Sequence, residues 1–482
     1  MASPLRRLRL RALVLVIIFA ALMAIAFAGA RRQQARGLGH ASLSPASSTI
    51  LPGPDQGIIS TQAATITVNS LSDAANGTDG LCTLREAITA ANSNTASGAV
   101  AGECAAGSNS GADLISFTVT GSIDLLGVLP DISSDMTITG PGSSQLTVRR
   151  STANLHRILT ITSGNVSVSG LTVKDGMTPD TSNTSTSAGG GIRNAGTLTL
   201  TDVIVTANKT QSTLGAGPGG GIFNQGTLAM TNCAVTANIT GPGTTGMAGN
   251  SGGGIANSGG SLTGSLTMTN CVVSNNETGT SPNVGGPGGG IFSAGPMTLI
   301  ASTISNNVTG NGITFGGHGG GIFNSHGAAL IINSTVSDNA TGTTPSGSRG
   351  YAGGIFNEND LTIVGSTISG NSDGTGGAVL ASRLLVVTNS TVSGNHSLSG
   401  GLHAGGSGTK MILTNCTVTA NDGPGVQNES DLSSIARNNI FAGNTGADVT
   451  GNWTSQGHNL IGRFAPGGFT DGVNGDQVGT FG

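Results

Sequence analysis

The block Gly-Gly-Gly-Ile-Phe-Asn occurs at residues 219–224 and again at residues 319–324, and close variants of it surround these two copies. The isoleucines of six such blocks are separated by 30, 33, 36, 31 and 33 residues: Ile192, Ile222, Ile255, Ile291, Ile322 and Ile355. Self-similarity at a period of about 20 to 50 residues is typical of a solenoid, in which each unit buries its apolar face only against its neighbours. The chain therefore grows by adding units, and its length does not predict a number of globular domains.

One unit of the repeat shows which solenoid the pattern favours. Residues 221–224, 227–231 and 233–236 are short runs in which apolar and polar side chains alternate, and turn residues such as Gln225-Gly226 separate them. Alternation with a period of two is the pattern of a half-buried strand. Three strands and three turns per unit predict one rung of an all-β, single-stranded, right-handed parallel β-helix. We expect about ten or eleven rungs at a spacing of about 4.8 Å.

Composition supports strands and argues against one class of partner. Glycine accounts for 82 of 482 residues, while charged residues make up 9% and aromatic residues 3%. The repeats are dominated by Thr, Val and Ile, which favour strands. Beyond residue 36, twelve basic residues face 23 acidic ones without any basic stripe, so nucleic acid is not an expected partner.

The first 30 residues predict an export signal. Four arginines precede the uncharged apolar run 12–28, and Ala28-Gly29-Ala30 has the small residues of a cleavage site. The run also approaches the roughly 20 residues of a membrane span, so an uncleaved signal anchor is the alternative. Both possibilities predict a secreted or cell-surface protein that contacts a membrane only through this segment. Residues 31–63, rich in Ser, Pro, Gly and Gln, predict a flexible linker.

Residues 64–111 predict a cap for the open N-terminal end of the solenoid. Thr83 and Glu86 have the spacing of a capping box. The apolar residues that follow Thr83 lie on one face of a short helix: Leu84, Ala87, Ile88 and Ala91. Cys82 and Cys104 flank this helix, and in an exported chain two such cysteines predict a disulfide.

The motif Cys82-Thr83-Leu84-Arg85-Glu86-Ala87 resembles the N-terminal Cys-Ser-Leu-Arg-Glu-Ala region of exported bacterial β-helix proteins, with threonine in place of serine. The resemblance implies a secreted or surface-attached bacterial protein, and it implies no reaction.

Residues 112–463 are expected to form the β-helix, and residues 464–482 a C-terminal tail. The stretch 439–462 is similar to the C-terminal region of bacterial β-helix surface proteins that carry varied anchoring tails. The Gly-Gly-Ile element also resembles the repeats of chlamydial-type polymorphic outer-membrane proteins and of autotransporter passengers. Those proteins are adhesive β-helices, so this resemblance implies an adhesin-like function.

A row of asparagines ends the third strand of successive units: Asn208, Asn238, Asn276, Asn307, Asn339, Asn371, Asn395, Asn421 and Asn444. Stacked amides can bond from rung to rung, and asparagine tolerates a left-handed backbone at a turn. Many of these residues also lie in Asn-x-Ser/Thr, which leaves glycosylation as the alternative to a by-product of the repeat.

Pectin-degrading lyases and galacturonases share this fold, so the sequence also has to be compared with the residue patterns of such enzymes. Fold alone does not establish activity; a lyase of this type needs clustered carboxylates for Ca²⁺ and a basic residue. Acidic residues are sparse in the array, and Gly317-His318-Gly319 stands without the other galacturonase motifs. The densest polar group follows the first strand of successive rungs: His326, Glu358, Asp360 and Arg383. It is either a small acid/base or sugar-binding cluster or a solvated turn.

Two further features remain as candidate binding surfaces. Phe223, Phe292, Phe323 and Phe356 occupy one slot beside the inward isoleucine, so they form either an outward aromatic stripe or a row buried under loops. The stretches between the third strand and the next glycines vary in length and leave the solenoid at one corner. Such insertions on one face of a solenoid commonly carry binding sites.

Three cysteines share a slot that is serine in other rungs: Cys233, Cys271 and Cys416. Cys233 and Cys271 lie on adjacent rungs and either pair or remain buried free thiols; parallel in-register strands suit a disulfide poorly. No cysteine or histidine spacing indicates a metal site.

We therefore expect a secreted or cell-surface β-helix with a binding or structural function. Its expected partner is an extracellular glycan or a surface protein, and we expect a monomer without a cofactor. The alternative is a carbohydrate-active enzyme of the pectate-lyase type, which would require Ca²⁺.

Overall fold

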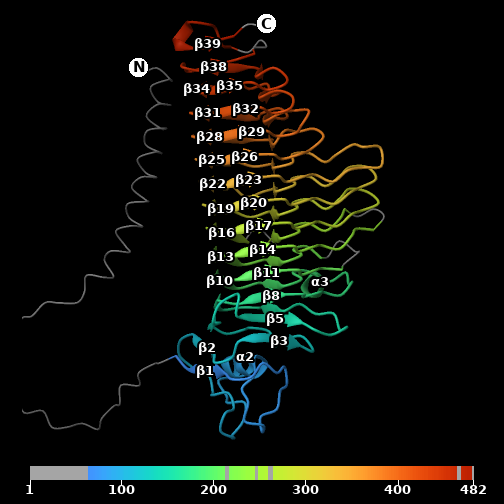
Figure 1. Ribbon diagram of the computed structural model, residues 1–482, viewed down its shortest axis with the longest axis vertical. Helices are drawn as coiled ribbons and strands as arrows, with labels where there is room; N and C mark the ends of the chain where they lie inside the picture. The colour runs from blue at the N-terminus through green and yellow to red at the C-terminus, as the bar shows by residue number, and fades with distance from the viewer. Residues whose placement is uncertain (1–62, 212–216, 245–247, 259–263, 464–467, 480–482) are drawn as a thin grey trace, which may run out of the picture. The chain divides into compact units, whose positions relative to one another are not determined.

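Each unit of the repeat folds into one coil of a parallel β-helix, as Figure 1 shows for the computed structural model. The structure describes residues 63–479 except 212–216, 245–247, 259–263 and 464–467. The predicted export signal and residues 31–62 of the predicted linker lie outside the described residues.

Three parallel sheets run along the stack, and each complete coil contributes one strand to each of them, while the end coils contribute to sheets I and II only. Sheet I has 14 strands: β1 (Thr65–Val68), β2 (Asp113–Phe117), β4 (Met136–Thr139), β7 (Asn165–Ser169), β10 (Thr197–Thr201), β13 (Thr227–Thr231), β16 (Ser265–Thr269), β19 (Met297–Ile300), β22 (Ala329–Ile332), β25 (Leu361–Val364), β28 (Leu384–Thr388), β31 (Lys410–Thr414), β34 (Ser434–Arg437) and β37 (Trp453–Ser455). Sheet II also has 14: β3 (Gly121–Leu125), β5 (Leu146–Arg150), β8 (Thr172–Lys174), β11 (Ile204–Thr206), β14 (Ala234–Thr236), β17 (Val272–Ser274), β20 (Thr303–Ser305), β23 (Thr335–Ser337), β26 (Thr367–Ser369), β29 (Thr391–Ser393), β32 (Thr417–Thr419), β35 (Ile440–Ala442), β38 (Leu460–Ile461) and β39 (Gln477–Val478).

Sheet III is shorter, with 11 strands: β6 (Leu159–Ile161), β9 (Ile192–Asn194), β12 (Ile222–Asn224), β15 (Ile255–Asn257), β18 (Ile291–Ser293), β21 (Ile322–Asn324), β24 (Ile355–Asn357), β27 (Val379–Ala381), β30 (Leu402–Ala404), β33 (Val426–Asn428) and β36 (Val449–Gly451). The described helices are α2 (Leu84–Ser93), α3 (Thr184–Ser187) and the 3₁₀ turn η1 (Val473–Gly475).

The pairing register places equivalent residues of neighbouring coils on top of one another. Ile222 pairs with Ile192 on one side and with Ile255 on the other, and all three are fully buried. The predicted parallel β-helix is therefore confirmed. The 11 strands of sheet III correspond to eleven complete three-stranded coils, in agreement with the expected ten or eleven rungs, and sheets I and II extend beyond them to 14 strands each. The first and last coils lack the glycine block.

The first glycine of each block makes the turn into sheet III. Gly219 has a φ of 72°, and a Cβ atom there would lie 2.3 Å from the carbonyl oxygen of Ile222. Both the backbone conformation and the limited space therefore disfavour a side chain at this position. In one coil Ala352 takes the same left-handed conformation, with a φ of 57°.

The nine asparagines named above form a buried ladder, which we call the asparagine ladder. Asn307 shows the pattern: its Oδ1 accepts from the main-chain N and the Nδ2 of Asn276, at 3.0 and 2.9 Å. Its Nδ2 donates onward to Asn339 Oδ1 at 2.9 Å. The ladder ends where Asn444 donates from N and Nδ2 to the carboxyl group of Asp448, at 3.0 and 2.7 Å.

The asparagines of the ladder do not themselves adopt the left-handed conformation that asparagine tolerates. The residue before each of them does so instead, as Asn306 (φ 55°), Ala237 (φ 55°) and Gly394 (φ 63°) show. The physical reason is that the ladder side chain must point inward, so the turn falls on the preceding residue.

The Asn-x-Thr pattern is explained by a second row of contacts beside the ladder. Thr240, Thr278 and Thr309 each donate from Oγ1 to a main-chain carbonyl of the same loop, at 2.8, 2.5 and 2.7 Å. Each of these hydroxyls also accepts from a glycine N–H of the next coil. Asparagine and threonine are thus both structural, and the ladder amides are too buried to accept a glycan in the folded protein.

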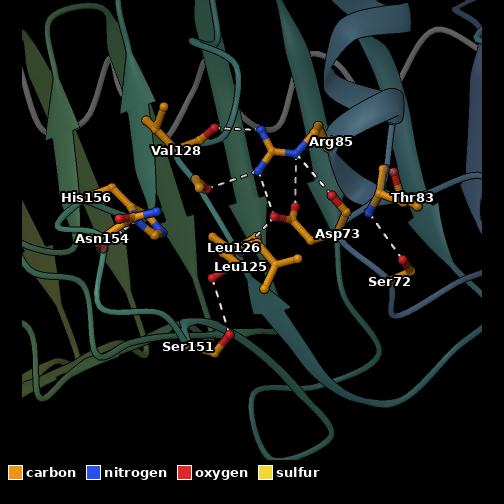
Figure 2. Close-up of polar contacts among 12 residues, drawn as sticks. Ser72, Asp73, Thr83, Arg85, Leu125, Leu126, Val128, Ser151, Asn154 and His156 are labelled. Atoms are coloured by element: carbon orange, nitrogen blue, oxygen red, sulfur yellow. Dashed lines mark hydrogen bonds and ion pairs between the residues drawn. The ribbon is translucent and has the colours of Figure 1, made fainter. Parts of the chain in front are cut away.

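The N-terminal cap explains the Cys82–Ala87 motif residue by residue. Cys82 and Cys104 form a disulfide, and Thr83 and Glu86 form the predicted capping box of α2. Leu84 and Ala87 are buried. Figure 2 shows Arg85 contacting both carboxylate oxygens of Asp73, at 3.0 and 2.8 Å, and the carbonyl oxygen of Val128 at 2.6 Å. The motif thereby attaches the helix to the first coils.

Candidate functional site

Long loops project from one side of the stack, where sheet II turns back toward sheet III (Figure 1). Each loop has an outward arm that follows the asparagine ladder and a returning arm that leads to the glycines. The threonine contacts described above join the two arms at their base. Because both arms are held to each other and to the next coil, the loops stack in register.

Six aromatic rings gather between the returning arms and the outer face of sheet III. Phe292 stacks on Phe323 with ring centroids 5.6 Å apart and an interplanar angle of 6°, and Phe323 meets Phe356 at 4.9 Å. His318 lies 5.0 Å from Tyr351, and Phe315 lies 6.3 Å from Tyr351. Such distances are favourable for aromatic pairs.

We call Phe315, His318, Tyr351 and Phe356 the aromatic platform. Phe315 is 40% exposed and Tyr351 is 36% exposed, whereas His318 and Phe356 are half-buried. The planes of the two exposed rings are inclined at 29°, and such a pair on a packed base is suited to stacking against the apolar face of a sugar.

The central ring of the platform is held neutral. His318 Nδ1 accepts from the main-chain N–H of Tyr351 at 3.0 Å, which places the ring proton on Nε2. Burial lowers the pKa of His318 below its usual range. The platform therefore presents an uncharged surface at neutral pH.

The predicted phenylalanine stripe is divided between two environments. Phe223 is buried in a small cluster with Ala188 and Ala256, while Phe323 is 9% exposed and supports the platform. Phe292 and Phe356 are half-buried. The row thus lies on the outer side of sheet III but under the loops.

A second feature of the loop side is an open groove of about 600 Å³ on the outward arms. It spans three consecutive loops, which contribute residues 280–282, 311–313 and 343–345, and Gly243 also lines it. Ile313, in the middle loop, is 64% exposed.

The predicted polar cluster is only partly assembled. Arg383 Nε lies 3.1 Å from Asp360 Oδ1, and both side chains are substantially exposed. His326 Nδ1 lies 3.0 Å from the hydroxyl of Ser325. Partial burial raises the pKa of Glu358, and the nearby His326 opposes this shift. Within the described part of the chain, no ion pair joins His326 to either carboxylate.

Asp373 is a buried acid that lies outside the candidate site residues predicted from the sequence. It is 6% exposed, and neither of its carboxylate oxygens has a well-formed hydrogen bond. Its neighbouring donors are the Ser397 hydroxyl and the N–H groups of Ala352 and Gly353, and burial raises its pKa to about 7. Asp373 occupies the loop-base position that is threonine in the preceding coils, next to Thr341.

The remaining cysteines are free and buried, and the main-chain N of Cys233 donates to Cys271 Sγ at 3.3 Å. Burial raises the pKa of the Cys416 thiol. Among the residues that the structure describes, no three His, Cys, Asp or Glu side chains are placed to share a metal ion. No helix in the described ranges has the length and apolar character of a membrane span.

Phe315, Tyr351 and Ile313 were missed because they lie in loops without periodicity. One signal was available: Tyr351 is the only tyrosine of the chain, and aromatic residues make up only 3% of it.

The fold and the loops on its side assign the protein to a structural class, but they do not identify a biochemical activity. Residues 289–461 match the family model described as a right-handed β-helix region, and the three parallel sheets of the chain form a right-handed parallel β-helix fold.

Solved structures of similar fold include the Azotobacter vinelandii mannuronan C-5 epimerase AlgE6 A-module. It is 13% identical, with 72% of this chain and 90% of that chain covered and a TM-score of 0.37. The AlgE4 A-module from the same organism is 11% identical, with 83% and 93% covered and a TM-score of 0.34. The Dettilon tailspike protein is 11% identical, with 77% and 61% covered and a TM-score of 0.33. No curated protein sequence matches the chain. We draw no functional argument from these likenesses.

Proposed function

We propose that this protein is an exported, adhesin-like β-helix that binds an extracellular glycan on its loop side. The observation that carries the proposal is the aromatic platform, in which the exposed Phe315 and Tyr351 rings lie 6.3 Å apart on a packed base. Aromatic rings present a large rigid apolar surface, which is the surface that carbohydrate-binding sites use against sugar rings.

Export and surface location rest on the sequence alone. The arginine-rich start, the apolar run and the resemblance of the Cys82–Ala87 motif support secretion or attachment to a bacterial surface. A disulfide in the cap is consistent with an oxidising compartment. We expect a monomer, because the loop side needs no second copy to complete the platform.

A pectate-lyase-type reaction is the alternative, and it has less support. The four residues predicted as an acid/base cluster contribute one exposed ion pair, Asp360 with Arg383, rather than a set of carboxylates around a base. Such exposed pairs are common on protein surfaces and contribute little.

The test is binding of the full chain to a glycan microarray, compared with the Phe315→Ala and Tyr351→Ala variants. We expect each variant to weaken binding roughly tenfold, which corresponds to about 1.4 kcal/mol. Phe315→Tyr, which keeps a ring, is the matched control and should bind nearly as well. Unchanged binding by both alanine variants would contradict the platform assignment, and release of unsaturated uronides from pectin would favour the enzyme.

A further inference from the structure

The groove on the outward arms has two parallel rows of side chains, all exposed except the half-buried Thr343. Ser281 pairs with Gly312, and Gly312 donates its N–H to Thr343 O at 3.1 Å. This register aligns a polar row of Thr280, Asn311 and Thr343 beside an apolar row of Pro282, Ile313 and Pro345. The residues between the two rows are buried.

The groove is without charge. None of the residues that line it is ionisable, so nothing there would neutralise the carboxylates of an acidic polysaccharide. A buried or half-buried carboxylate without a partner is costly, which disfavours uronate chains and acidic peptides. Neutral hydroxyl-rich polymers incur no such cost.

The rows repeat at the spacing of the coils. Stacked strands lie about 4.8 Å apart, which is close to the length that one pyranose ring adds to an extended polysaccharide. Equivalent groups on consecutive loops can therefore meet consecutive sugars. Asn311 uses its Oδ1 to accept from the Thr343 N–H at 2.8 Å, and its Nδ2 has no acceptor among the described residues.

We infer that the groove binds an uncharged, linear polysaccharide that lies along the stacking direction. Sugar ring faces contact the apolar row, and hydroxyl groups accept from or donate to the polar row, including Asn311 Nδ2. This inference rests on the proposed glycan-binding function and specifies its ligand class and orientation.

The experiment measures affinities of the full chain for two sets of hexasaccharides by calorimetry. The neutral set is cellohexaose, laminarihexaose and mannohexaose, and the acidic set is hexagalacturonate and hexamannuronate. Ile313→Glu places a charge in the apolar row. Leu398→Glu, at a 78% exposed position outside the groove, is the matched control.

We expect at least one neutral hexasaccharide to bind, and the acidic set to bind at least roughly tenfold more weakly. We also expect Ile313→Glu to lose roughly tenfold in affinity for the neutral ligand, while Leu398→Glu loses none. If Ile313→Glu fails to fold by circular dichroism, Pro345→Glu replaces it. Equal or tighter binding of the acidic set overturns the inference. Loss of binding in Tyr351→Ala but not in Ile313→Glu also overturns it and leaves the proposed function standing, whereas no glycan binding at all contradicts both.

Discussion

Replacing Asn307 by alanine should destabilise the protein far more than an ordinary surface substitution. The change removes the bonds from Asn276 N and Nδ2 to Oδ1, and those from Asn307 Nδ2 to Val273 O and Asn339 Oδ1, all between 2.9 and 3.0 Å. It also leaves the buried N–H of Asn276 without this acceptor. Four hydrogen bonds at about 1 kcal/mol each, and one orphaned amide, give a loss of roughly 4 to 6 kcal/mol.

The assay is urea unfolding followed by circular dichroism, combined with amide hydrogen exchange. Exchange is needed because a solenoid can open locally, so the loss can be confined to the coils on either side of Asn307. Protection should fall for the amides of Asn276 and its neighbours before those of distant coils.

The control is Asn306→Ala, one residue away. Asn306 is exposed and left-handed, and alanine stands at the equivalent position in Ala207, Ala237 and Ala420. We expect this variant to lose no more than about 1 kcal/mol. If both variants lost the same small amount, the ladder would not be a source of stability and the reasoning would fail.

Three further predictions concern the cap and the buried acid. Because burial raises the pKa of Asp373 to about 7, the folded protein holds that proton more tightly than the unfolded chain. Stability should therefore fall as pH rises from about 4 to about 7, and Asp373→Asn should remove this dependence and stabilise the protein by up to about 4 kcal/mol at pH 8, measured by urea unfolding. Arg85→Ala leaves the almost fully buried Asp73 carboxylate without its cationic partner and should lower the free energy of unfolding by about 3 kcal/mol, measured by thermal unfolding. Replacing Asp73 by alanine in the Arg85→Ala variant should cost less than the same replacement in the unaltered protein. Reduction of the Cys82–Cys104 disulfide should cost about 3 kcal/mol; a stability that is the same with and without reductant would contradict this.

The sequence predicted those parts of the fold that depend on periodicity. Ile222 and its equivalents recur at the coil length and alternate with outward residues, so their stacking in the core could be anticipated. Thr83 and Glu86 formed the expected capping box because that contact is local, spanning three residues.

The candidate binding surfaces were less predictable because they depend on how loops return to the solenoid. His318 was recognised in the sequence only as an isolated Gly-His-Gly. Its place between Tyr351 and Phe356 is set by stacking of loops from adjacent coils. In the sequence, Asp373 cannot be distinguished from an exposed acidic residue. It lies where the coil that ends at Asn371 is followed by a shorter coil, which ends at Asn395.

The asparagine ladder has a direction. Every amide presents its oxygen toward the N-terminal neighbour and its nitrogen toward the C-terminal one, so the side-chain dipoles add along the row. Aligned amides of this kind leave partial positive charge at one end, as the first turn of a helix does. Here that end faces the carboxyl group of Asp448, and Asp476 accepts in the same way from Asn459, at the end of a second row. A coil inserted in the middle would extend the row unchanged. A coil added beyond Asp448 would meet a carboxylate, which accepts hydrogen bonds but cannot donate one to a further amide. The two aspartates thus complete the hydrogen bonding of the two amide rows at their C-terminal ends.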